Sequence, residues 1–221
     1  MEPHANVSLP SSPAPAPTRS MAEGPPQGPA GRKEATASAR VIILVAMIFL
    51  AALTRLIPHP PNFAPMTAMA LFAAAHFRSR LFALVAPLLA LFASDLGIEA
   101  FHRLGLMRSW GLYPGMWINY AALALVTVLG FVFIDRKSVG AVAGTTLLGS
   151  LTFFLVTNFG VWAGETLYPK TAVGLLICYL EGIPFFGWSL LGDVFYVTLF
   201  FGAFALAERR FPALAPKPAA A

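Results

Sequence analysis

Charged residues are scarce in this chain: Asp, Glu, Lys and Arg make up only 11% of its 221 residues, whereas 57% are hydrophobic. Soluble domains carry about 25% charged residues, so this composition excludes a disordered chain and disfavours a water-soluble enzyme. Cysteine is almost absent as well. The single cysteine, Cys178, excludes an intrachain disulfide and any metal site built from several cysteines.

Catalytic and nucleotide-binding signatures are also missing. The chain has no Gly-x-Ser-x-Gly, no His-Glu-x-x-His and no Gly-rich phosphate loop ending in Lys, so we expect no ATP hydrolysis and no other enzymatic activity. His59 and His102 could share a metal ion, but their spacing matches no ligand pattern, and we expect neither metal nor cofactor. The net charge of +5 comes from short basic clusters between apolar blocks, which argues against nucleic acid as a partner.

What the chain does have is a series of apolar blocks behind a segment rich in proline and alanine. Residues 1–39 contain no apolar run and predict a disordered tail, residues 40–208 a transmembrane helical domain, and residues 209–221 a short cytoplasmic tail. The blocks lack strand periodicity, and several approach the ~20 residues of a membrane-spanning helix, with shorter ones tolerated inside a bundle. They cover residues 41–57, 64–77, 80–94, 113–134, 138–163, 171–183 and 187–207.

The positions of the basic residues distinguish six spans from seven. If the block at 171–183 only partly enters the membrane from outside and the other six cross, both termini and all but four of the fifteen basic residues lie in the cytoplasm. Gly182 and Pro184 interrupt the last apolar stretch, which favours a separate short helix there. We therefore predict an all-α bundle of six transmembrane helices, with an extra short membrane-embedded helix before the last span, in the cell (inner or plasma) membrane. The four basic exceptions are Arg55, Arg103, Arg108 and Lys170.

The polar residues of the predicted spans collect at the outer side, which predicts a pocket that opens to the exterior. Asn158 and Trp162 are four residues apart and share one helix face. Asp95 and Asp193 are the strongest candidates for functional residues, because a carboxylate within a span is a functional residue by default. The full set of candidate substrate-binding residues is Arg55, His59, Asn62, Phe63, Asp95, Asn119, Asn158, Trp162, Tyr168, Lys170 and Asp193.

Several candidates also have a structural interpretation. Arg55 could snorkel to the interface, or pair with Asp95 or Asp193, instead of holding a ligand. Trp162 could belong to the aromatic belt at the membrane surface. Asn158 could serve only to join two helices by a hydrogen bond. At this stage both interpretations remain open for each of these residues.

An ordered set of motifs resembles a family of uncharacterised bacterial integral membrane proteins over about residues 40–208. The motifs are RLIPHPPNFAP at 55–65, SD at 94–95, TNFGVW at 157–162, YPKT at 168–171, IPFF at 183–186 and LLGD at 190–193. That family in turn looks like the S components of energy-coupling-factor (ECF) vitamin transporters. The resemblance implies an S-component-like fold with its ligand pocket near the outer surface, covered by the loops after the first and third spans.

The resemblance also implies a function, the binding and uptake of a small water-soluble nutrient such as a vitamin or its precursor. It implies partners too, an ECF-type coupling subunit and its ATPases. Many S components contact that subunit through an Ala-x-x-x-Ala face on the first span, but here the pairs Ala64/Ala68 and Ala70/Ala74 lie on the second block, so a solitary transporter stays open. The alternative functions are a structural or assembly protein of the membrane and an intramembrane enzyme.

Overall fold

Helices make up the regular secondary structure of the residues that the computed structural model describes, 29–134 and 138–214. Two single turns of 3-10 helix, η1 (Thr54–Leu56) and η2 (Pro212–Leu214), follow the first and last helices. No strand occurs in the described residues, so the predicted all-α class is confirmed. The six helices are α1 (Pro29–Leu53), α2 (Met66–His76), α3 (Arg80–Arg103), α4 (Trp117–Phe133), α5 (Val139–Gly164) and α6 (Ala172–Arg210).

Among the described residues, four segments are long and apolar enough to cross a membrane: Ser38–Leu56, which contains most of α1, and the helices α3, α5 and α6. Only 22% to 44% of their apolar windows is buried inside the bundle, so most of their side chains face outward. Leu50 and Leu199, for example, remain 64% and 49% exposed. An apolar exterior of this extent suits lipid and not water, and the chain is therefore a membrane protein.

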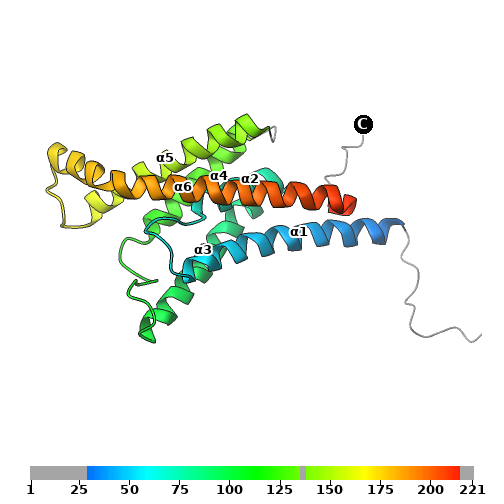
Figure 1. The fold of residues 1–221 in the computed structure, drawn as a ribbon, viewed down its shortest axis with the longest axis horizontal. Coiled ribbons are helices and arrows are strands. Elements are labelled where there is room, and N and C mark those ends of the chain that lie inside the picture. Colours follow the sequence, from blue (N-terminus) through cyan, green and yellow to red (C-terminus); the bar gives the residue numbers. More distant parts are fainter. Residues whose placement is uncertain (1–28, 135–137, 215–221) are drawn as a thin grey trace, which may run out of the picture.

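The shortest helix, α2, is the centre of the bundle and packs against each of the other five helices (Figure 1). Its 11 residues reach only ~16 Å, about half of the hydrocarbon core of a bilayer. Residues 66–73 are buried throughout, and a glycine on α4 allows close approach, since a Cβ atom at Gly130 would lie 2.6 Å from the Cβ atom of Ala74. Because the surrounding helices bury residues 66–73 of α2, a helix too short to cross alone is tolerated there.

The last helix, α6, is continuous over 39 residues and therefore ~58 Å long (Figure 1). The prediction of a separate short helix at 171–183 before the last span is wrong. Pro184 removes one backbone hydrogen bond, but α5 packs on both sides of it. The ring of Phe154 contacts the rings of Tyr179 and Phe186, with centroids 5.8 and 4.9 Å away. This packing outweighs the tendency of the proline to break the helix.

The helical domain begins earlier than the sequence predicted. α1 starts at Pro29, so residues 29–39 are helical and not part of a disordered tail. A proline is favourable in the first turn, alanine and most charged residues favour helix, and an existing helix extends at little cost. The rest of the predicted tail, residues 1–28, lies outside the described residues.

The segment that ends at Leu214 packs against the bundle, although the sequence predicted a separate tail from residue 209 onward. Arg40 of α1 forms an ion pair with Glu208 of α6 at 2.8 Å and donates a hydrogen bond to the backbone carbonyl of Leu214. The guanidinium group also lies over the ring of Phe204, 5.1 Å from its centroid. Hence η2, placed by the sequence in the cytoplasmic tail at 209–221, packs on α1. Residues 215–221 lie outside the described residues.

Candidate functional site

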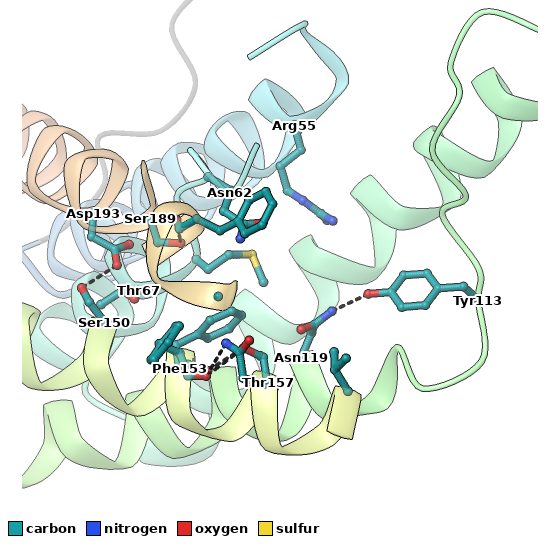
Figure 2. A pocket seen from close by; sticks show the side chains of 17 residues that line it. Arg55, Asn62, Thr67, Tyr113, Asn119, Ser150, Phe153, Thr157, Ser189 and Asp193 are labelled. Carbon is teal, nitrogen blue, oxygen red and sulfur yellow. Dashed lines mark hydrogen bonds between the residues drawn. The ribbon is translucent and has the colours of Figure 1, made fainter. Parts of the chain in front are cut away.

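A cavity of about 360 Å³, called the polar pocket below, lies between the α5–α6 pair and the adjoining ends of α2 and α4 (Figure 2). Small-molecule sites usually measure ~300–1,000 Å³, so this pocket suits a small ligand. Its wall combines hydroxyl, amide and charged side chains with several aromatic rings. The lining residues are Arg55, Asn62, Ala64, Met66, Thr67, Tyr113, Asn119, Ser150, Phe153, Phe154, Thr157, Asn158, Val161, Gly182, Phe185, Ser189 and Asp193.

The proline-rich loop between α1 and α2 forms one wall of the pocket. Asn62 adopts a left-handed backbone conformation with φ of 62°, which asparagine tolerates better than most residues. Gly192 lets the loop lie directly on α6, since a Cβ atom there would be 3.2 Å from the backbone nitrogen of Ala64. The ring of Phe63 packs on that of Phe195, with centroids 5.8 Å apart. These contacts hold Asn62 at the edge of the cavity.

Asp193 lies in the middle of α6 and is only 3% exposed. Its carboxylate accepts a hydrogen bond from the hydroxyl of Ser150 at 2.6 Å (Figure 2). It also accepts hydrogen bonds from the hydroxyl and the backbone N–H of Thr67. Thr67 is the second residue of α2, whose N-cap residue, Pro65, provides no side-chain cap. Asp193 thus caps α2 from another helix, at the positive end of its dipole.

Asp193 lies in the middle of a continuous α6, whereas the sequence placed it near the start of a separate last span. The difference follows from the continuity of α6, because the residues from Ala172 onward belong to the same helix as Asp193. A buried carboxylate at mid-helix is more costly than one at a helix end near water. Its hydrogen bonds to α2 and α5 offset part of that cost.

Arg55 pairs with Asp95, one of the two partners that the sequence left open. The distance from Nη1 to Oδ1 is 2.7 Å, and the side chains are 19% and 5% exposed. The same nitrogen contacts the hydroxyl of Ser94, and Tyr120 donates its hydroxyl to Oδ2 of Asp95 at 2.6 Å. Asp95 is therefore held away from the pocket, whereas the guanidinium group of Arg55 is directed toward the cavity (Figure 2).

Two asparagines complete the polar wall. Asn119, near the start of α4, donates to the hydroxyl of Tyr113. Burial, and secondarily the charge of Asp95, raises the pKa of Tyr113, which therefore remains a neutral hydroxyl group. Asn158 donates to the backbone carbonyl of Phe154 at 2.9 Å, and its Oδ1 lies so close to Gly182 that a Cβ atom there would be 2.6 Å away. Asn158 both joins α5 to α6 and lines the pocket.

Three candidates lie beyond the pocket, at the turn between α5 and α6. Trp162 donates its indole N–H to the carbonyl of Pro169 at 2.9 Å, and the ammonium group of Lys170 lies 5.8 Å from its ring centroid. Tyr168 donates its hydroxyl to Glu181 at 2.7 Å, and this bond raises the pKa of Tyr168 to about 12. The chain reverses direction here, and these side chains bond to the turn or to the first half of α6, so none of them lines the cavity.

The other candidates support the pocket from outside or stand apart from it. Nδ1 of His59 lies 2.8 Å from the carbonyl oxygen of Pro60 on an exposed loop. Phe63 and Asp95 do not line the cavity, but they contact residues next to it: Phe63 packs on Phe195, and Asp95 pairs with Arg55. Within the residues that the structure describes, no group of three or more His, Cys, Asp or Glu is placed to hold a metal ion. The candidates that the structure brings together around the cavity are Arg55, Asn62, Asn119, Asn158 and Asp193.

The pocket also contains hydroxyl side chains that the sequence reasoning missed, namely Thr67, Ser150, Thr157 and Ser189. Serine and threonine are common in apolar helices, where the hydroxyl bonds to a carbonyl one turn earlier, as Thr157 does to Phe153 at 2.8 Å. The residue type alone is therefore no signal of a site. The distinguishing feature is a bond from one helix to another, such as that from Ser150 to Asp193, and one sequence does not reveal such pairs.

Comparison with known proteins supports the resemblance to an uncharacterised family, but not the further resemblance to ECF S components. No curated protein and no solved structure matches the chain. A family model described as a family of unknown function, DUF6580, matches residues 35–214, which reach from α1 to η2. The matched segment contains every residue that lines the polar pocket. The chain therefore belongs to DUF6580, a family of unknown function.

Proposed function

We propose that this protein binds and takes up a small water-soluble nutrient, such as a vitamin or a vitamin precursor, and does not catalyse a reaction. The polar pocket carries the proposal, because several elements of an otherwise apolar bundle direct hydrogen-bonding groups into one cavity of about 360 Å³. Polar groups are costly in such a bundle and usually mark a site. The rings of Phe153, Phe154 and Phe185 add flat apolar surface, which suits a heteroaromatic ligand.

We further propose an S-component-like arrangement of six crossings in the cell membrane, with both termini in the cytoplasm and the pocket facing outward. Two observations support it. The ion pair between Arg40 and Glu208 brings the start of the apolar part of α1 and the end of α6 to the same end of the bundle (Figure 1). That end also carries Arg209 and Arg210, which the positive-inside rule places in the cytoplasm.

The identity of an energising partner is part of the same proposal. Contact with an ECF-type coupling subunit through the Ala-x-x-x-Ala pairs would need those alanines on the surface. Ala68 and Ala70 are fully buried in α2, at the centre of the bundle. These pairs offer no docking face, so we favour a protein that works alone or that contacts a coupling subunit through another surface.

Uptake by cells that express the full chain tests the proposal, with a panel of radiolabelled vitamins and precursors. Thr157 and Thr152 give a matched pair of variants, because both lie on α5 and donate to the carbonyl four residues earlier at 2.8 Å. Only Thr157 lines the pocket, whereas Thr152 is partly buried and lines neither the pocket nor any other cavity described here. Thr157→Val should raise the half-saturating concentration of the nutrient roughly tenfold, as expected for one lost hydrogen bond.

Thr152→Val should leave uptake unchanged, since that hydroxyl never meets the ligand. Equal effects of the two variants would show that the pocket is not the binding site. Absence of uptake above that of cells without the protein, for the whole panel, would instead favour the structural alternative. In that case the polar groups only join helices.

A further inference from the structure

A second cavity lies on the other side of Asp193, between the same two helices. It is an apolar groove of about 750 Å³ between the first half of α5 and the second half of α6. Thr146 and Leu147, about one turn before Ser150, line the groove, as does Val194, the neighbour of Asp193. Ser150 and Asp193 line the polar pocket. The hydrogen bond between their side chains therefore lies at the boundary between the two cavities.

The hydrogen atoms at this boundary can be arranged in two ways. The hydroxyl oxygen of Ser150 lies 2.9 Å from the carbonyl oxygen of Thr146 and 2.6 Å from Oδ2 of Asp193, but it carries only one hydrogen atom. If Ser150 donates to Asp193, the carboxylate is ionised. If Ser150 donates to Thr146, as hydroxyls in helices commonly do, then the short contact with Oδ2 requires a proton on Asp193.

The surroundings of Asp193 strongly favour neither its ionised nor its protonated form. On α2, the backbone N–H of Thr67 and the positive end of the helix favour the carboxylate. Burial favours the protonated form, and within the described residues no basic side chain forms an ion pair with Asp193. The charged or titratable groups that line the two cavities are Arg55 and Tyr113 in the pocket and His76 and Glu208 in the groove. Arg55 is already engaged by Asp95.

We infer that Asp193, with Ser150 and Thr67, forms a reversible proton-binding site at the boundary between the polar pocket and the apolar groove. One proton moves onto Oδ2 of Asp193 while the Ser150 hydroxyl turns from Asp193 to the Thr146 carbonyl, and the reverse movement releases it. If the protein takes up a nutrient as proposed above, this site couples uptake to proton movement. The proton site itself stands without that function.

Infrared difference spectroscopy of the full chain in sodium-free liposomes tests the site without any nutrient. Acidification from mildly alkaline to mildly acidic pH should produce the carbonyl stretching band of a protonated, buried carboxyl group. Asp193→Asn should abolish this band, and the fold should persist because the amide oxygen still accepts the bond from Thr67 N–H. Ser150→Ala should keep the band but shift it, since the carboxyl group loses its hydrogen-bond partner.

Glu165→Gln is the matched control, because Glu165 is an exposed carboxylate in the loop after α5. This variant should leave the band of the buried carboxyl group unchanged. The proton site would be overturned if the wild type showed no titrating band. It would also be overturned if the band persisted in Asp193→Asn and did not shift in Ser150→Ala. Carboxylate bands that respond to added sodium chloride in the wild type but not in Asp193→Asn would show a sodium site instead. A titrating band without nutrient uptake would refute the transport function alone.

Discussion

Replacement of Arg55 by leucine is expected to lower the free energy of unfolding by about 3–5 kcal/mol, the usual cost of leaving one member of a buried ion pair alone. The carboxylate of Asp95 is 5% exposed and would keep only the hydroxyl of Tyr120 as a partner at Oδ2. Denaturation of the purified protein in detergent, followed by circular dichroism, measures the change.

The double variant Arg55→Leu/Asp95→Asn should recover most of the lost stability, because the neutral amide no longer needs a cation and still accepts from Tyr120. The double variant Arg55→Leu/Asp193→Asn should show additive effects, since the ion pair of Arg55 is with Asp95. Recovery with Asp193→Asn and none with Asp95→Asn would mean that the pairing described here is wrong.

Two glycines of α5 are expected to respond to alanine with opposite signs. A Cβ atom at Gly149 would lie 2.9 Å from Cγ2 of Thr67 and 3.1 Å from Cγ1 of Val126, both on stiff β-branched side chains. Gly149→Ala should therefore cost about 1–3 kcal/mol of unfolding free energy through overpacking. It should also disturb the contact between Thr67 and Asp193.

Gly144 of the same helix is the control, because a Cβ atom there would meet nothing within 4 Å. Gly144→Ala should stabilise the protein by about 0.5–1 kcal/mol, the usual gain from alanine in a helix. Thermal unfolding of both variants in one detergent gives the comparison. Stabilisation by Gly149→Ala would show that α2 and α5 do not pack as closely as the structure has them.

The class of the fold follows from general features of the sequence, because apolar blocks without strand periodicity predict helices. The sequence predicts the short block at 64–77 as one span of a bundle, but it does not predict the central position of that block. The continuity of α6 could not be predicted in this way. Gly182 and Pro184 look like an interruption unless the packing of Phe154 on both sides of the proline is known.

In the candidate site, too, some features could be predicted from the sequence and others could not. A charged or amide side chain in or beside an apolar block is costly and therefore noticeable in the sequence, and Arg55, Asn119, Asn158 and Asp193 all line the pocket. Their partners depend on how the helices rotate against one another, which one sequence does not reveal. For this reason the choice between Asp95 and Asp193 as the partner of Arg55 stayed open, and the hydroxyl of Ser150 went unnoticed.

Native mass spectrometry of the detergent-solubilised full chain, mixed with a panel of vitamins and precursors, tests the central proposal most directly. We expect a one-to-one adduct with a member of the panel. Asn158→Ala should weaken it by about 1–3 kcal/mol, or roughly 5–150-fold in affinity, because a polar group of the ligand is left unpaired. Thr157→Val should weaken it as well, and Thr152→Val should not. No adduct with any member, or an adduct that survives both pocket variants unchanged, would contradict the proposal that the polar pocket binds a nutrient.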